Sequence, residues 1–326
     1  MLRFVFFHRN KTAGFSIDKV TQNIIKNFND REEYYAPCYN ASPFSILKNI
    51  IYVFCHRQKN AINHVTGDIH YCILGLIKCK SVLTIHDTVS LDFNKYSSFY
   101  RFVLEWLWYR IPLYFAKNVV CISEETKKSV MRFSNRKDIR VIYNAVDPKM
   151  VFAPKKINLQ TPRILIIGTN PNKNIERTIE ALAGIECIVV IVGVLNETHK
   201  KLLQRNNIQY ENKYNLSDDE IIEEYKKCDI VSFVSLYEGF GMPIIEANAI
   251  GRPVICSDIP VLHEVANDAA EFVNPYDVEE IRKAFYTLKS SPYLCQDLIE
   301  KGQRNICRFE QPKILKEWVD FYSTII

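Results

Sequence analysis

Short apolar runs alternate with amphipathic stretches along most of this 326-residue chain. A buried strand of a parallel sheet shows the first pattern, and a helix covering such a sheet shows the second. The runs that predict strands lie at 3–8, 80–87, 118–123, 163–168, 187–193, 229–234 and 253–256, and residues 61–71 read as a strand, a turn and a helix start. Because strands and helices alternate, we expect an α/β fold with parallel sheets.

Two regions fit this alternation less well. Prolines break residues 29–60 into short pieces without a clear element. Farther on, apolar residues recur at helical spacing until Pro112 interrupts them. These residues are Phe99, Phe102, Val103, Trp106 and Leu107. We expect a helix that packs on the core, although its aromatic content beside Arg101 and Arg110 also fits an interfacial helix.

Length and composition narrow the class of protein. A chain of this length is long enough for two domains with sizeable cores. It contains no run of eighteen uncharged apolar residues, so we expect no membrane-spanning helix. Charged residues follow Met1 too closely for a signal peptide, and the ten cysteines are scattered without a zinc-binding spacing. We therefore expect reduced cysteines and a cytoplasmic location.

The two halves of the chain differ in charge. Residues 1–150 contain 22 Lys and Arg against 12 Asp and Glu, a balance of +10, whereas the remainder contains 20 against 25, a balance of −5. A basic half can meet nucleic acid, an anionic membrane or a phosphorylated substrate. No nucleic-acid-binding motif accompanies the charge, so we expect no such partner.

The basic half predicts peripheral contact with the inner, anionic face of a membrane. Solubility alone is the competing explanation for the charge. The expected contact residues are basic side chains interleaved with aromatic ones. They are Arg101, Arg110, Lys117, Trp106, Trp108 and Tyr114.

The most informative stretch follows one of the apolar runs. It reads Ser-Leu-Tyr-Glu-Gly-Phe-Gly-Met-Pro-Ile-Ile-Glu from Ser235 to Glu246. Pro243 suits the start of a helix, and Gly251 suits its end. Glu238 then lies in a strand-to-helix loop and Glu246 one turn into the helix, toward the carboxyl edge of the sheet, where open α/β folds bind ligands. A carboxylate accepts two hydrogen bonds at once, which suits the paired hydroxyls of a sugar or ribose.

This stretch resembles the Glu-x7-Glu signature of the retaining family-4 glycosyltransferases. Those enzymes have the GT-B fold, an α/β arrangement of two Rossmann-like domains with parallel sheets facing across a cleft. The resemblance implies that Glu238 is catalytic and contacts the transferred sugar, and that Glu246 holds the nucleotide ribose. It also implies that loop amides hold the sugar and the diphosphate. These amides belong to Gly239, Phe240, Gly241 and Met242.

Three further residues match donor-side positions of that family. Gly14 stands in the turn after the first strand, where a bare backbone can approach a phosphate. Lys173 precedes a helix, where its charge and the helix amides could meet a diphosphate together. His86 ends the run 80–87 and resembles the family's catalytic histidine, which reaches a hydroxyl of the donor sugar. The arginine that the family often has in the loop before the lysine is absent, which puts a second cation for the phosphates in doubt.

Polar residues near the same sheet edge are candidates for acceptor contacts. Asp68 and Asp87 follow predicted strands, and His64 and His70 lie beside them. For both histidines a structural role is an equal alternative. A metal site is the rival interpretation, but no histidine pair lies four residues apart on a recognisable helix, and no Asp-x-Asp pair exists. We therefore expect no metal ion and no other cofactor.

The resemblance sets the expected domains and function. Residues 1–150 with 311–326 form an acceptor-side Rossmann-like domain, and residues 151–310 form the domain that binds the nucleotide sugar. The expected activity is retaining transfer of a sugar from a nucleoside-diphosphate sugar to a hydroxyl of a glycan or lipid-linked acceptor, in assembly of a bacterial-type surface polysaccharide or lipopolysaccharide. A sugar-nucleotide epimerase of the same fold and a non-catalytic glycan- or nucleotide-binding protein are the alternatives.

Overall fold

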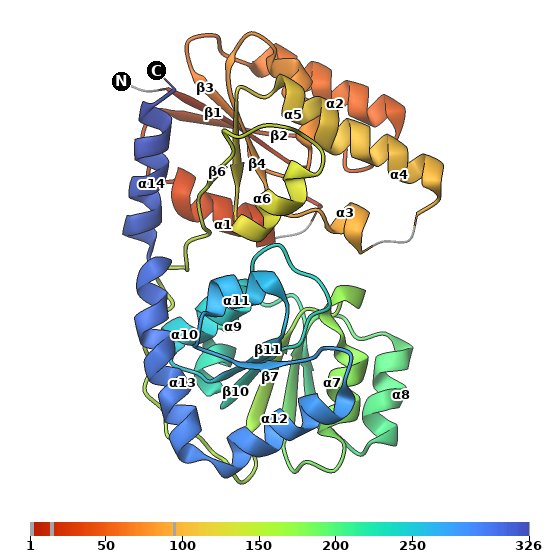
Figure 1. Ribbon diagram of the computed structural model, residues 1–326, viewed down its shortest axis with the longest axis vertical. Coiled ribbons are helices and arrows are strands. Elements are labelled where there is room, and N and C mark those ends of the chain that lie inside the picture. Colours follow the sequence, from red (N-terminus) through yellow and green to blue (C-terminus); the bar gives the residue numbers. More distant parts are fainter. Residues whose placement is uncertain (1–2, 14–15, 94–95, 326) are drawn as a thin grey trace. The chain divides into compact units, whose positions relative to one another are not determined.

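The computed structural model describes residues 3–13, 16–93 and 96–325. The chain divides into two compact units, one formed by residues 1–145 with 311–326 and the other by residues 146–310. Each unit contains one six-stranded sheet (Figure 1). Neighbouring strands of both sheets run parallel, as the alternating pattern predicts.

The first unit has the strand order β2-β1-β3-β4-β5-β6. Its strands are β1 Phe4–His8, β2 Arg31–Tyr35, β3 Ile62–Val65, β4 Lys80–Ile85, β5 Asn118–Cys121 and β6 Arg140–Val141. Its helices are α1 Ser16–Ile25, α2 Pro43–His56, η1 His70–Leu76, α3 Val89–Asp92, α4 Ser98–Leu104, η2 Glu105–Arg110, α5 Ile111–Phe115, α6 Glu124–Met131 and α14 Gln311–Ser323. Alternate side chains of β1 enter different layers, because successive residues of a strand face opposite sides of the sheet. Val5 and Phe7 join the core that includes α2, η1 and α5, whereas Phe4 and Phe6 join the core that includes α1 and α14 (Figure 1).

The second unit has the strand order β12-β11-β10-β7-β8-β9. Its strands are β7 Arg163–Ile167, β8 Ile188–Val192, β9 Gln209–Lys213, β10 Ile230–Phe233, β11 Val254–Ser257 and β12 Glu271–Val273. Its helices are η3 Pro171–Lys173, α7 Ile175–Leu182, α8 Glu197–Arg205, α9 Asp218–Lys227, α10 Met242–Ile250, α11 Pro260–Ala266, α12 Val278–Ser290, α13 Pro292–Asn305 and η4 Ile306–Arg308. Strands β7 and β10 are neighbours, so the loops that follow them meet at one sheet edge.

The structure differs from the sequence-based expectation in two helical regions of the first unit. Residues 29–60 are not short pieces, because Pro43 opens the 14-residue helix α2 after the N-cap Ser42. Pro112 does not interrupt the aromatic helix. The preceding residues 105–110 form a π-helical turn, in which the Ile111 amide donates to the Trp106 carbonyl, and helix α5 continues through the proline.

Capping residues define several helix ends, and Gly251 ends its helix as predicted. Ser123 caps α6 by accepting from the Thr126 amide, and Ser217 forms a capping box with Glu220 at the start of α9. Gly251 ends α10 in the left-handed conformation, with φ of 82°. Within the described residues, no helix combines the length and apolar character needed to cross a bilayer.

Candidate functional site

Lys173 and Glu238, two predicted donor-binding residues of the second unit, lie in two loops at one sheet edge. The loop after β7 carries Lys173, and the loop after β10 carries Glu238. The Lys173 Nζ lies 2.6 Å from Glu238 Oε1, and both side chains are mostly buried, with 19% and 13% exposed. Lys173 also lies over the Phe233 ring, 4.7 Å from its centroid. The structure therefore brings these two residues together as an ion pair.

Backbone contacts hold the two loops against each other. The Leu236 amide donates to the Asn172 carbonyl at 2.7 Å, and Asn172 Nδ2 donates to the Tyr237 carbonyl at 3.0 Å. On the other side, Ser257 Oγ donates to the Ser235 carbonyl at 2.6 Å. These bonds fix the backbone next to Glu238 from two neighbouring strands. Sequence reasoning singled out neither Asn172 nor Ser257, because neither stands in a motif.

The glycine at position 241 is required by the close packing of this loop. Gly241 has φ of 131°, and a Cβ there would lie 2.9 Å from Leu262 Cδ2. Phe240, in contrast, turns into the unit, where its ring packs edge-on against Phe309 with centroids 5.7 Å apart. Its side chain is therefore structural, and only its backbone can serve a ligand. Met242 then begins α10.

Glu246 lies one turn into α10 and is 9% exposed. Its Oε2 accepts a hydrogen bond of 2.7 Å from the hydroxyl of Tyr225, a fully buried residue of α9. Burial, followed by the Glu246 charge, raises the pKa of Tyr225 well above its usual value. The Tyr225 hydroxyl therefore stays protonated near neutral pH and donates its hydrogen bond to Glu246. No spacing in the sequence marks Tyr225 as a partner of Glu246.

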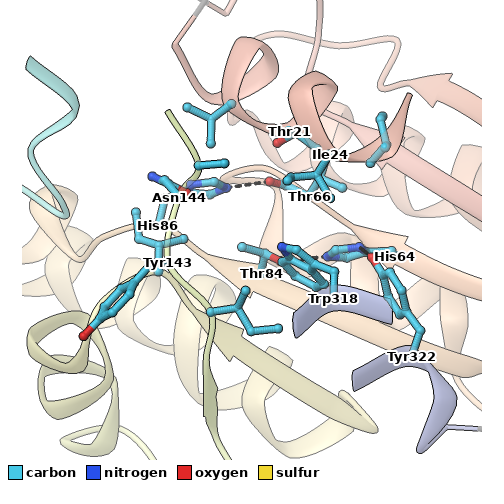
Figure 2. A pocket seen from close by; sticks show the side chains of 15 residues that line it. Thr21, Ile24, His64, Thr66, Thr84, His86, Tyr143, Asn144, Trp318 and Tyr322 are labelled. Atoms are coloured by element: carbon cyan, nitrogen blue, oxygen red, sulfur yellow. Dashed lines mark hydrogen bonds between the residues drawn. The ribbon is translucent and has the colours of Figure 1, made fainter. Parts of the chain in front are cut away.

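In the first unit, the three histidines that were predicted to be site residues, His64, His70 and His86, are buried. His64 sits in β3 with both ring nitrogens bonded, Nε2 to Thr84 Oγ1 and Nδ1 to the Tyr322 hydroxyl, each at 2.7 Å (Figure 2). Burial lowers the pKa of His64 to about 3. Both ring nitrogens of His64 therefore have partners within the first unit. His70 likewise bonds the Trp108 carbonyl through Nδ1 at 2.8 Å.

His86 follows β4 and differs from His64 in its bonding. Its Nε2 lies 2.7 Å from the Thr66 carbonyl, an acceptor only, so Nε2 carries the proton (Figure 2). Burial lowers the pKa of His86 to about 4, which keeps the ring neutral near pH 7. A neutral ring protonated at Nε2 presents Nδ1 as a hydrogen-bond acceptor. Both His64 and His86 line a small cavity of about 30 Å³ in the first unit (Figure 2).

The remaining predicted residues are spread along the same edge. The Asp68 carboxylate is exposed and lies 3.9 Å from Arg9, whereas Asp87 Oδ1 accepts from the Val89 amide at the start of α3. Gly14 lies outside the described residues. Among the residues that the structure describes, no group of three or more His, Cys, Asp or Glu could hold a metal ion.

Comparisons with known proteins match this chain to sugar-transferring enzymes. The family profile described as "Glycosyl transferases group 1" matches residues 150–305, and the profile "Glycosyltransferase Family 4" matches residues 56–150. The O-antigen chain mannosyltransferase RfbU of Salmonella typhimurium is 30% identical over 224 residues, which are 65% of this chain and 60% of that protein. The chain thus spans less than two thirds of this curated relative.

Two solved structures share the fold over nearly the whole chain. Sucrose-phosphate synthase from Thermosynechococcus elongatus superposes with a TM-score of 0.82 at 15% identity, covering 99% of each chain. The Anabaena protein Alr3699/HepE, solved in complex with UDP and glucose, has a TM-score of 0.80 at 14% identity and covers 99% of this chain and 100% of its own. The predicted GT-B fold, with one parallel sheet in each of two Rossmann-like units, is therefore confirmed.

Proposed function

The chain belongs to the group 1, family-4 glycosyltransferases, and on this premise we propose that it transfers a sugar from a nucleoside-diphosphate sugar to an acceptor hydroxyl. The bond between the anomeric carbon and the diphosphate breaks, and a bond to the acceptor oxygen forms with retention at that carbon. The nucleoside diphosphate leaves with the electron pair of the broken bond, and its departing oxygen takes up the proton that the acceptor hydroxyl loses. The observation that carries the proposal is the Lys173–Glu238 ion pair at the sheet edge of the second unit.

Each member of this pair suits one part of the donor. The ammonium group of Lys173 matches the diphosphate, whose negative charge grows as it departs, and stabilising that charge lowers the barrier. The Glu238 carboxylate matches sugar hydroxyls, which donate to it. Donor binding then exchanges the 2.6 Å ion pair for two contacts to the ligand. After this exchange Lys173 faces the anionic diphosphate and Glu238 accepts hydrogen bonds from hydroxyls, so each mostly buried charge keeps a polar partner.

The remaining donor contacts follow from the same premise. Glu246, oriented by Tyr225, binds the ribose hydroxyls, and the amides of residues 239–242 hold the sugar and the phosphates. His86 accepts a hydrogen bond from a donor hydroxyl through Nδ1. Gly14 supplies a backbone amide to the diphosphate. His64, Asp68 and Asp87 are the candidates for acceptor contacts.

The donor sugar and acceptor are inferred from the relative. Because RfbU is an O-antigen chain mannosyltransferase, a mannosyl donor is the first to test, and a growing surface glycan is the first acceptor. A lipid-linked form of that acceptor would bring the enzyme to the inner face of a membrane. Among the contact residues expected there, Trp106 and Tyr114 are exposed. Trp108 is only partly exposed, its Nε1 donates to the Asp68 carbonyl, and its ring packs on Tyr71.

The test is turnover of nucleotide sugars with and without acceptor. Mannose and glucose nucleotides are incubated with a lipid-linked glycan, and free nucleotide and extended glycan are both quantified. Acceptor-dependent release is expected, and it should persist in chelator because Lys173 and backbone amides take the place of a divalent ion. Donor isomerisation without acceptor would indicate an epimerase, and donor binding without turnover would indicate a binding protein. Activity that disappears in chelator and returns with magnesium or manganese contradicts the metal-free site.

A further inference from the structure

Helix α2 in the first unit is apolar on two faces, because Ile46, Ile50 and Val53 pack toward the core while a second apolar stripe faces solvent. Four large apolar side chains, spaced at helical intervals along one face, are exposed to solvent. They are Phe44, Leu47, Ile51 and Phe54, with 75%, 55%, 52% and 54% of their surface exposed. The buried positions of the same helix are Ser45, Asn49 and Val53. A helix of a soluble domain normally turns its apolar stripe to the core.

Polar contacts fix this orientation of α2. The fully buried Asn49 accepts from the Cys38 amide at 3.0 Å, and it donates to the Cys38 carbonyl at 3.1 Å and to the Tyr71 hydroxyl at 2.9 Å. Turning the helix by half a revolution would expose Val53 and leave these buried groups without partners, which is costly. The apolar face is therefore held outward by the rest of the unit.

The chain segment that carries this face is basic. Residues 34–67 contain three cations, Lys48, Arg57 and Lys59, and not one Asp or Glu. Arg57 lies over the Phe54 ring, 3.3 Å from its centroid, so a cation borders the apolar stripe directly. Helix α2 packs on η1, which is followed by the half-exposed Ile77 and by Lys78.

We propose that α2 docks on an anionic lipid bilayer, lying in the plane of the interface with Phe44, Leu47, Ile51 and Phe54 among the acyl chains. An apolar stripe flanked by basic residues is the pattern of helices that lie on membranes. The long stems of Lys48 and Lys59 can follow the apolar side chains into the interface while their charges reach lipid phosphates. At 14 residues the helix is too short to span the bilayer.

Charge distinguishes the bilayer from a second copy of the chain. Packing α2 of one copy on α2 of another would bring Lys48, Arg57 and Lys59 together with their own counterparts, without an acid in the segment to compensate. Like charges across an interface oppose association. An anionic bilayer supplies the missing negative charge and the apolar phase together.

The docking surface rests on the proposed function only where it explains access to a lipid-linked acceptor. It also moves the expected membrane contact from the aromatic helix to α2. Both α2 and the run α4–η2–α5 lie on the same side of the sheet of the first unit (Figure 1). Helix η1 lies between them and contacts α2, η2 and α5. Phe99 and Phe102 of α4 are exposed as well, so the two helices can be tested against each other.

The test is flotation of the full chain with vesicles of phosphatidylcholine alone and of phosphatidylcholine mixed with phosphatidylglycerol, at low and high salt. We expect binding to the mixed vesicles, weaker at high salt. The double variant Leu47→Ser, Ile51→Ser should lose at least about tenfold in vesicle affinity, because polar groups replace apolar ones that enter the lipid. The triple variant Lys48→Gln, Arg57→Gln, Lys59→Gln should lose about fivefold per charge and respond less to salt.

Matched controls lie in the second unit. Val194→Ser with Tyr293→Ser removes exposed apolar surface elsewhere, and Lys200→Gln, Lys201→Gln, Lys283→Gln removes the same number of charges. Both controls should bind vesicles like the wild type. Leu47→Trp should gain fluorescence quenching by brominated lipids beyond that of the native tryptophans. Melting temperatures close to that of the wild type would show that the variants fold.

Several outcomes would overturn the proposal. Equal binding of wild type and α2 variants, or loss of binding only in Phe99→Ser with Phe102→Ser, assigns the contact to another surface. A dimer in solution that the Leu47→Ser, Ile51→Ser variant dissociates, with no vesicle binding by the wild type, assigns the face to a second copy. Nucleotide-sugar binding, measured by calorimetry on the same proteins, separates the two proposals: retained donor binding without vesicle binding refutes the docking surface alone.

Discussion

At the scale of single residues, the predicted donor-binding side chains already have partners within the second unit. Lys173 and Glu238 are mostly buried and share one short contact, and Glu246 is held by Tyr225. Buried charges need partners, since an unpaired one is expensive. A ligand that carries both negative phosphates and hydroxyl donors can replace these internal partners. Substitutions at these positions should therefore impair donor binding and turnover.

Glu238→Gln should remove transfer while leaving the fold intact. The amide loses a charge-assisted acceptor for sugar hydroxyls, which is worth about 1.5–3 kcal/mol per bond, or one to two decades in rate. Steady-state kinetics and thermal unfolding measure the two effects. Glu279→Gln, at an exposed position of α12, is the matched control and should behave like the wild type. Turnover near the wild-type rate in Glu238→Gln would refute its catalytic role.

Tyr225→Phe should weaken donor binding more than it slows transfer. Without the phenol hydroxyl, the Glu246 carboxylate loses one donor and the orientation it gives. A hydrogen bond to a charged group is worth about 1.5–3 kcal/mol, so we expect KM for the donor to rise about tenfold or more with kcat less affected. Tyr286→Phe, half-exposed on α12, is the control. A fall in kcat at unchanged KM would place Glu246 at the reacting sugar instead of the ribose.

At the scale of elements, α14 shows how a helix from the end of the chain completes the first unit. Its buried positions are Ile314, Trp318 and Tyr322, four residues apart on one face, and they join the core beside β1, β3 and β4. Leu315 and Phe321 pack against the same core but are only partly buried. The Tyr322 hydroxyl also reaches His64 in β3.

Tyr322→Phe should therefore destabilise the first unit by about 1–3 kcal/mol. The substitution keeps the ring in the core but leaves one nitrogen of the buried His64 without its partner. Chemical denaturation monitored by circular dichroism gives the free energy of unfolding. Tyr293→Phe, at a largely exposed position, controls for loss of a hydroxyl. An unchanged free energy of unfolding in Tyr322→Phe would mean that the bond contributes nothing.

At the scale of the whole molecule, burial of histidines couples stability to pH. Burial lowers the pKa of His8 to about 4, of His64 to about 3 and of His86 to about 4. An unfolded histidine titrates near 6.5, so below that pH the unfolded chain binds protons that the folded chain does not. The contribution of these neutral, buried histidines to the free energy of unfolding is complete above about pH 6.5. It is lost as the pH falls from about 6.5 to about 4. For a pKa lowered from 6.5 to about 4, the full loss is about 3 kcal/mol.

We expect the free energy of unfolding to fall steeply between about pH 7 and pH 5, a range in which most carboxylates are still ionised. His8→Gln should flatten this dependence, because glutamine can keep a hydrogen bond to Thr66 Oγ1 without titrating. His263→Gln, a half-exposed histidine in the second unit, should leave the slope unchanged. Equal slopes in His8→Gln and the wild type would contradict the assignment of the pH dependence to buried histidines.

The sequence determined the fold class and the loop from Ser235 to Glu246 because both depend on residues that are close together along the chain. Apolar runs and their spacing predict parallel strands at β1, β4, β5, β7, β8, β10 and β11, and these strands form as predicted. The loop from Ser235 to Glu246 is contiguous, so its glycines, its proline and its two acids could be interpreted together. The glycosyltransferase group 1 profile matches residues 150–305, which include this loop.

Tertiary structure decided the features that join residues distant in sequence. Tyr225 meets Glu246, and Tyr322 meets His64, only because separate elements pack, and no spacing encodes such pairs. The exposure of one apolar face of α2 could not be predicted from the sequence either. A periodic pattern identifies an apolar stripe, but it does not show on which side of the helix the rest of the unit lies. Asn49 sets that side through contacts with Cys38 and Tyr71, 11 and 22 residues away.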